Sequence, residues 1–185
     1  MFRAALSLTL VALAPAVPVS SLSSGAAVAV CFAPEENCAD FADRAIGNAE
    51  REILVGAYGL TIGSSIAEAL IRAKGRGIDV RLIAKTTPCE RNSAVGPLAA
   101  AGVPIWIDDQ ARIAHAKTMV IDGAVTLTGS YNWTRGAAAN SENLNLISSH
   151  DVAAAYSAHW RQRLAVSIRF DRKKDWCRVA TTEAR

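Results

Sequence analysis

Six positions between residues 115 and 132 have types and spacing that suit chemistry on a phosphodiester. His115 and Lys117 stand two residues apart, and Ser130 and Asn132 stand two residues apart further along. A neutral imidazole can act as a nucleophile near neutral pH, and a lysine supplies a positive charge. Hydroxyl and amide groups donate hydrogen bonds to phosphate oxygens. The four side chains together could attack phosphorus and stabilise the charge that develops.

Asp122 and Gly123 lie between two alternating apolar runs, at 116–121 and 124–128. Asp-Gly in this setting predicts a β-hairpin, because a type I′ turn needs positive φ at both central residues. We therefore interpret Asp122 and Gly123 as turn-forming residues and expect Asp122 to stay out of the chemistry.

A two-residue loop makes paired positions sum to 245. This register sets His115 opposite Ser130 and Lys117 opposite Thr128, with the polar side chains on one face of the hairpin. Tyr131 and Trp133 alternate with the polar pair, so we expect them in the core rather than stacked on bases.

The spacing resembles the complete signature of the phospholipase D superfamily, and especially of its small bacterial nucleases with one motif per chain. The resemblance rests on His115-x-Lys117-x4-Asp122-x6-Gly129-Ser130-x-Asn132. The segment 140–143 is similar to the one that supplies those nucleases with an active-site glutamate, here Glu142. The likeness extends from about Cys31 to Arg163.

This resemblance implies a covalent phosphohistidine on His115 that water then hydrolyses, without a cofactor. Lys117, Ser130 and Asn132 would bind the phosphate. Glu142 would accept the ring N–H of a histidine and stabilise its positive charge.

A second histidine is needed as the acid for the leaving group. His150 and His159 lack neighbours in motif spacing, and we expect His159 to be structural. We therefore predict a symmetric homodimer in which His115 of each subunit faces a single composite site.

No acidic pair is combined with a histidine at ligand spacing, so we expect no metal. Asp40 with Asp43 and Asp108 with Asp109 are interpreted as solvated carboxylates. Activity should therefore survive EDTA.

Strands and helices alternate along the chain, which predicts an α/β fold with a mixed, mainly parallel sheet flanked by helices on both faces. We expect strands at 28–32, 53–58, 78–84, 103–107 and 142–147, besides the hairpin. We expect helices at 35–51, from a cap at 64–65 to 74, at 93–101 and at 152–166.

The chain of 185 residues has 51% apolar and 20% charged residues, as is typical of one globular domain. Residues 1–29 resemble a secretory signal, with a basic head and an apolar run broken by Pro15 and Pro18. A retained membrane anchor is the alternative. We expect an exported protein, periplasmic or secreted, with a catalytic domain at 30–170, a basic tail at 171–185 and no stable membrane insertion after processing.

Four cysteines in an exported chain predict disulfides, with three possible connectivities. Our preferred pairs are Cys38–Cys89 and Cys31–Cys177. No pair has the spacing of a zinc site.

The substrate is expected to be nucleic acid, either DNA or RNA, with little sequence preference. The net charge of +3, or +2 without residues 1–29, is only mildly favourable to an anionic partner. A phospholipase D acting on phospholipid head groups is the alternative enzyme. A non-catalytic nucleic-acid-binding protein is a further alternative, although such a protein would be expected to lack His115, Lys117 or Asn132.

Overall fold

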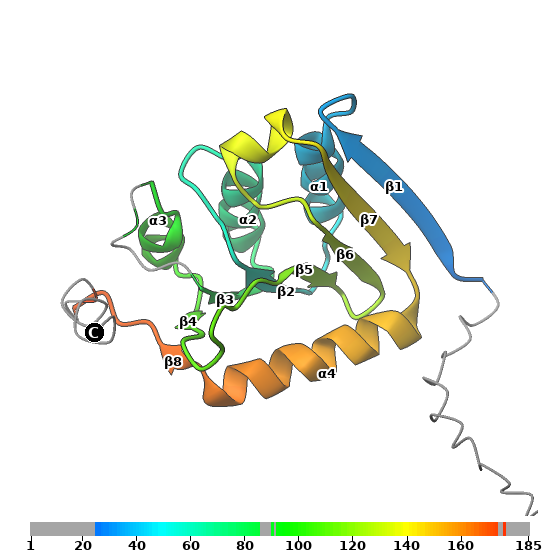
Figure 1. Cartoon of the computed structure of the whole chain (residues 1–185). Helices are drawn as coiled ribbons and strands as arrows, with labels where there is room; N and C mark the ends of the chain where they lie inside the picture. The colour runs from blue at the N-terminus through cyan, green and yellow to red at the C-terminus, as the bar shows by residue number, and fades with distance from the viewer. Residues whose placement is uncertain (1–24, 86–89, 91, 174–175, 177–185) are drawn as a thin grey trace, which may run out of the picture.

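One eight-stranded sheet organises the computed structural model, which describes residues 25–85, 90, 92–173 and 176 (Figure 1). The strands are β1 (Ala27–Ala33), β2 (Glu52–Ala57), β3 (Asp79–Ala84), β4 (Ile105–Ile107), β5 (Lys117–Ile121), β6 (Val125–Gly129), β7 (Glu142–Ser148) and β8 (Ile168–Arg169). The helices are α1 (Cys38–Gly47), α2 (Ser65–Gly75), α3 (Val95–Ala100), the 3-10 helix η1 (Arg135–Ala139) and α4 (His150–Val166). Every element expected from the sequence is present, with shifted ends.

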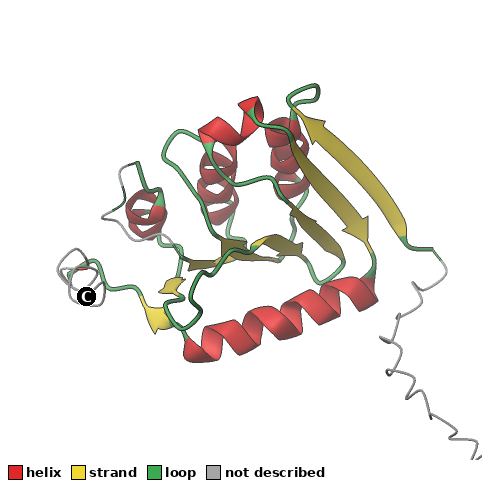
Figure 2. Cartoon of the chain, viewed as in Figure 1, coloured by secondary structure: helices red, strands yellow, loops and turns green. Residues whose placement is uncertain are grey.

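The strand order is β1-β7-β6-β5-β2-β3-β4-β8, and helices cover both faces (Figure 2). The expected mixed α/β sandwich is therefore confirmed. The expectation of mainly parallel pairing is wrong, because only β2–β3 and β3–β4 are parallel among the seven strand pairs of the described residues. The hairpin joins β5 to β6 in antiparallel order, and β7 returns antiparallel beside β6 after η1.

Two apolar layers hold the helices to the sheet. Helices α1, α2 and α3 pack on one face, in a core that includes Ile46, Leu70 and Met119. Helix α4 crosses the other face, where Val120 and Trp160 belong to a second, smaller core (Figure 1). Met119 and Val120 are neighbours in β5, so the two-residue alternation of a strand feeds both layers.

Side-chain caps fix where the helices begin. Ser64 Oγ accepts a hydrogen bond from the backbone N–H of Ala67 (3.2 Å), which confirms the expected cap of α2. The helix expected at 35–51 is shorter, since Asn37 Oδ1 accepts from Asp40 N–H (3.1 Å) and starts α1 at Cys38.

The hairpin turn forms at Asp122 and Gly123, whose φ angles are 55° and 66°. The expected register is wrong by one residue: Ile121 pairs with Val125, so paired positions sum to 246. Ala124 is the extra residue. Its N–H donates to Ile121 O (3.0 Å) and closes the turn, while its carbonyl accepts a hydrogen bond from Ser149 N–H (2.9 Å) at the start of α4.

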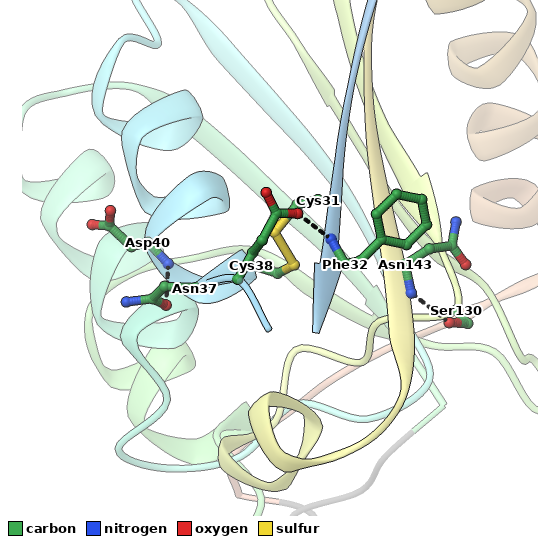
Figure 3. The surroundings of a disulfide bond; sticks show 8 residues. Cys31, Phe32, Asn37, Cys38, Asp40, Ser130 and Asn143 are labelled. Carbon is green, nitrogen blue, oxygen red and sulfur yellow. Dashed lines mark hydrogen bonds between the residues drawn. A yellow bond between two sulfur atoms is a disulfide. The ribbon is translucent and has the colours of Figure 1, made fainter. Parts of the chain in front are cut away.

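Cys31 and Cys38 form a disulfide that joins β1 to the first residue of α1 (Figure 3). This bond contradicts both preferred pairings. Cys89 and Cys177 lie outside the described residues. The expectation failed because Cys31 and Cys38 sit on either side of a short turn, and the chain reverses there.

Strand β1 starts at Ala27, within the range assigned to the signal segment. Residues 27–29 pair with 146–148 of β7, so cleavage after residue 29 would remove three of the seven paired residues. Among the helices of the described residues, none combines the length and apolar character needed to cross a bilayer.

Candidate active site

The expected site residues come from strand ends that meet at one edge of the sheet. Lys117 opens β5 and pairs with Ala57, the last residue of β2. Gly129 ends β6 and pairs with Leu144, near the start of β7. Because these strands run antiparallel, their ends bring residues far apart in the sequence to the same edge.

His115 and Lys117 are in direct contact. Lys117 Nζ lies 3.0 Å from His115 Nε2 and donates to the carbonyl oxygen of His115 at 3.0 Å. The ring of Tyr58, which follows β2, packs edge-on against the imidazole with 4.3 Å between centroids. The same ring lies under the ammonium, with Nζ 4.7 Å from its centroid. Tyr58, His115 and Lys117 therefore form one cluster.

The Lys117 side chain is buried, with only 6% of the residue exposed. Burial lowers its pKa because the charged form loses water, while the negative charge of Glu142 acts in the opposite direction. The ring face of Tyr58 attracts the ammonium through its quadrupole. Lys117 is thus a buried cation that the described residues stabilise with a ring nitrogen, a carbonyl, an aromatic face and a carboxylate further away.

Asn132 lies beside Gly59, next in the chain to Tyr58, in an arrangement that the sequence did not predict. The observed register, in which paired positions sum to 246, sets Gly129 opposite Lys117. Strand alternation alone would therefore place Ser130 and Asn132 on the opposite face of the hairpin from Lys117. The chain leaves β6 at Gly129, and Trp133 then pairs with Leu60, beside Tyr58. A Cβ at Gly59 would lie 3.4 Å from Asn132 Oδ1. That oxygen is buried without a hydrogen-bond partner among the described residues.

Ser130 is held by β7. Its Oγ accepts a hydrogen bond from Asn143 N–H at 3.0 Å, so the hydroxyl proton remains available for donation (Figure 3). Gly129 lets the two strands come this close, because a Cβ there would lie 2.1 Å from Asn143 O. The glycine of the motif therefore has a steric role.

Glu142 lies next to Asn143 and accepts a hydrogen bond from Asn140 Nδ2 at 3.2 Å. Its negative charge acts to raise the pKa of Lys117. Burial raises the pKa of the Tyr131 phenol, and the charge of Glu142 raises it further. Within one chain, no hydrogen bond joins Glu142 to His115, both of which are described. Tyr131 and Trp133 are buried in the core, as expected.

Asp122 lies at the opposite end of the hairpin and binds backbone. Its carboxylate accepts hydrogen bonds from the N–H groups of Glu50 (2.9 Å), Arg51 (2.8 Å) and Glu52 (3.0 Å). Burial acts to raise the pKa of Asp122, but these three donors and the charge of Arg51 lower it overall. Asp122 thus secures the start of β2 as well as the turn.

The other two histidines are His150, at the far end of the hairpin, and His159, on the α4 side of the sheet. His150 Nδ1 is 3.0 Å from the carbonyl of Gly123, at the turn end of the hairpin. That is on the order of 20 Å from His115 at ~3.3 Å per strand residue. His159 is exposed on α4, across the sheet from Lys117.

The four aspartates flagged in the sequence have different environments. Asp40 pairs with Arg44 and Asp43 with Arg72 at exposed positions. The expectation of a solvated carboxylate is wrong for Asp108, which is 4% exposed and bound by Arg163 through two hydrogen bonds of 2.8 and 2.6 Å. Within the described ranges, no three His, Cys, Asp or Glu side chains gather as a metal site would require.

The sequence analysis missed Tyr58 and Gly59. Their contacts depend on the pairing of β2 with β5, and no local pattern specifies which strand lies beside the hairpin. The available signal was indirect: Tyr58 is an amphipathic aromatic residue at the end of a buried apolar strand, where side chains reach the sheet edge.

Comparisons with known proteins give one family. The family model for the cardiolipin synthase, PLD-like domain matches residues 43–164. Phospholipase D of Rickettsia conorii is 35% identical over 140 residues, which cover 75% of this chain and 70% of that protein. Mitochondrial cardiolipin hydrolase of Xenopus tropicalis is 34% identical over 100 residues, covering 53% and 48%.

Solved structures agree with this result. The phospholipase D family member Nuc from Salmonella typhimurium superposes with a TM-score of 0.73 and 29% identity, covering 78% of this chain and 98% of that one. NucT from Helicobacter pylori gives a TM-score of 0.72 over 78% of this chain and 99% of that one, at 21% identity, and shows likeness of fold.

Proposed function

Because the chain belongs to the phospholipase D-like family and is a phosphodiester hydrolase of that superfamily, we propose that it is a metal-independent endonuclease with a composite site in a homodimer. Its substrate is DNA, with RNA as an alternative, cut with little sequence preference. The observation that carries the chemistry is the contact of Lys117 Nζ with His115 Nε2. The preference for nucleic acid rests on Nuc, nearly the whole of which this chain matches.

The first step forms a phosphorus–nitrogen bond. An ammonium has no acceptor, so a hydrogen bond from Lys117 to Nε2 requires the proton of the neutral ring to sit on Nδ1. The Nε2 lone pair then faces the site. When a phosphodiester enters, the Lys117 ammonium donates to its oxygens instead of to Nε2. Nε2 then attacks phosphorus while the bond to the leaving oxygen breaks.

The leaving oxygen needs a proton, and His115 of a second copy is proposed to give it. The position of His150 at the turn end of the hairpin supports this proposal, as does the position of His159 on the α4 side of the sheet, because Lys117, which contacts His115, faces the other side. The second imidazole, now neutral, takes a proton from water as the water attacks phosphorus. The phosphorus–nitrogen bond breaks and His115 is restored.

The remaining residues bind and orient. Lys117, Ser130 and Asn132 bind the non-bridging oxygens through the ammonium, the free hydroxyl proton and the amide. Glu142 is proposed to accept the ring N–H of the histidine from the second copy. Asp122, Gly123 and Gly129 shape the hairpin and take no part in the chemistry.

Export is proposed as well. The Cys31–Cys38 disulfide supports it, because such bonds form and persist mainly in oxidising compartments. Residues 1–24, which carry most of the proposed signal, lie outside the described residues.

A phospholipase D acting on lipid head groups is the second candidate, and the names of the Rickettsia relatives favour it. Both reactions use the same phosphodiester chemistry. The choice between them depends on what surrounds the phosphate.

One assay tests the proposal. Purified protein without residues 1–24 is incubated with plasmid DNA and, separately, with phosphatidylcholine vesicles, each with EDTA and each with a His115→Ala control. We expect the wild-type protein to cleave the DNA in EDTA and His115→Ala to be inactive. Choline release without DNA cleavage would establish the lipid reaction, and loss of activity in EDTA that magnesium restores would refute the histidine mechanism.

A further inference from the structure

A second cavity lies on the opposite side of β5 from the His115–Lys117 contact. It has a volume of about 240 Å³ and lies between α4 and the ends of β2, β3 and β4. We call it the α4 cavity. At ~30 Å³ per water molecule it holds about eight waters, which is enough room for one heterocyclic base.

Small residues create this space where the strands end. Gly56, Ala57, Ala114 and Ala116 form part of the wall. Gly56 is required for close packing, since a Cβ there would lie 2.7 Å from Thr118 Oγ1. The carboxyl ends of the parallel strands β2 and β3 meet the amino end of the antiparallel strand β5 at this place.

The opposite wall is aromatic. Tyr156 and Trp160 of α4 line the cavity, and the indole is fixed because its Nε1–H donates to Val55 O at 2.9 Å. Aromatic side chains of this kind stack on nucleic-acid bases irrespective of sequence.

The rim carries two basic side chains, Lys85 and Arg163, and one carboxylate, Asp108. Arg163 lines the cavity, and the buried carboxylate of Asp108 binds its Nε and Nη2. Nη1 of Arg163 can still donate to a ligand. Because Asp108 already fixes the guanidinium, binding a ligand would cost little further side-chain entropy. Lys85 and His159 line the same cavity. Glu90 approaches Lys85 only loosely, at 3.7 Å.

The α4 cavity is adjacent to the nucleophile. Ala114 and Ala116, which line it, are the two neighbours of His115 in the chain. Lys117 lies on the other face, with Met119 and the first core, whereas Thr118 lies on the cavity side. A polyanion that crosses the sheet edge at His115 would therefore meet both places.

We propose that the α4 cavity binds the nucleotide next to the scissile phosphodiester, with the base against Trp160 and its phosphate at Lys85 and Arg163. This inference rests on the proposed nuclease function and extends it to a subsite. An acyl chain would use the apolar wall but would offer no anion to Lys85 or to Nη1 of Arg163.

Binding of deoxyadenosine 5′-monophosphate to the ¹⁵N-labelled protein tests the proposal by NMR. We expect the resonances of the Trp160 indole and of Thr118 to shift on titration. Lys85→Met and Ala114→Leu should each weaken binding roughly tenfold or more, by removing a charge and by filling the space. Lys173→Met and Ala154→Leu are matched controls at exposed positions outside the cavity and should bind like wild type. Thermal unfolding of each variant shows that it is folded.

Three results would overturn the subsite: resonance shifts confined to His115 and Lys117, equal affinity in variants and controls, or no binding at about 10 mM nucleotide, roughly ten times the Kd of a weak site. A protein that cleaves DNA but shows any of these results keeps the proposed function without the subsite. A protein that cuts lipid and not DNA fails at the proposed function instead, whatever the titration shows.

Discussion

The ammonium of Lys117 holds both the side chain and the main chain of His115, at 3.0 Å from Nε2 and 3.0 Å from the carbonyl oxygen. A single buried cation therefore fixes the tautomer of the imidazole and the path of the backbone that carries it. The same contact makes Lys117 the first group that a bound phosphate would engage, since it is already next to the attacking nitrogen.

Lys117→Met should lower kcat for oligonucleotide cleavage by about 10²–10³-fold, the cost of one lost donor to a developing charge. Stability should not fall with it. Burial lowers the pKa of Lys117, so folding disfavours its charged form and an apolar side chain of similar length is tolerated. Activity assays and thermal unfolding measure the two effects, with Lys173→Met as the exposed control. A large drop in the melting temperature with unchanged kcat would contradict this role.

Tyr58 should set the pH at which Lys117 loses its proton. Because burial lowers the pKa of Lys117, we expect NMR of its side chain to show that Nζ loses its proton below the 10.5 of an ordinary lysine. Tyr58→Leu removes an aromatic face worth ~0.5–2 kcal/mol to the ammonium, so this titration should move further down. Tyr58→Phe keeps the ring and should leave the titration in place. The other groups around Lys117, His115 and Glu142, are unchanged in both variants, and an equal shift in both would assign the effect to the phenol oxygen.

The linked effect on stability has a definite sign. A folded-state pKa below the unfolded value means that the unfolded chain holds the Lys117 proton to higher pH. The contribution of Lys117 to the free energy of unfolding therefore increases as pH rises from its folded pKa towards 10.5.

Local patterns were enough to predict the elements of this protein but not the relations between them. Ser64 and the Asp122-Gly123 turn were predicted because caps and turns depend on neighbouring residues. The register slip at Ala124 arises from its bond to Ser149, 25 positions along the chain, and nothing near Ala124 signals it. The motif predicted His115, Lys117 and Asn132 as site residues, whereas the contact of Tyr58 with His115 and Lys117 depends on the pairing of β2 with β5, which no local pattern predicts.

Gly129→Ala should destabilise the protein by at least ~3 kcal/mol, because the new Cβ would lie 2.1 Å from the backbone oxygen of Asn143. No side-chain rotation can relieve this clash, so the strands themselves must move. Urea unfolding measures the loss. Gly136→Ala provides the control, since a Cβ there meets nothing within 4 Å. Similar midpoints for the two variants would show that β6 and β7 can separate freely.

Asp122→Asn should cost ~1–2 kcal/mol of stability, since an amide cannot accept from three N–H groups as a carboxylate does. The folded pKa of Asp122 is lowered, so its stabilisation is complete above the unfolded pKa of ~3.9 and is lost as pH falls through the folded pKa. Unfolding curves between pH 2 and 7 should converge at the acid end for wild type and variant. Asp109→Asn, at an exposed position, should follow wild type throughout.

The composite site makes a quantitative prediction about mixed dimers. If His115 of each copy is needed for one turnover, a dimer of one wild-type and one His115→Ala chain is inactive. Activity in random mixtures should then fall with the square of the wild-type fraction, to about one quarter at equal amounts, instead of linearly. Co-expression with two affinity tags isolates the mixed dimer for direct assay.

A His150→Ala chain serves as the control, because His150 contacts the hairpin turn and its replacement should leave mixtures fully active. Mixed dimers with near wild-type activity per wild-type subunit, or a fully active monomer, would show that one chain supplies both nucleophile and acid. In that case Lys117, already 3.0 Å from Nε2, becomes the first candidate for the proton donor.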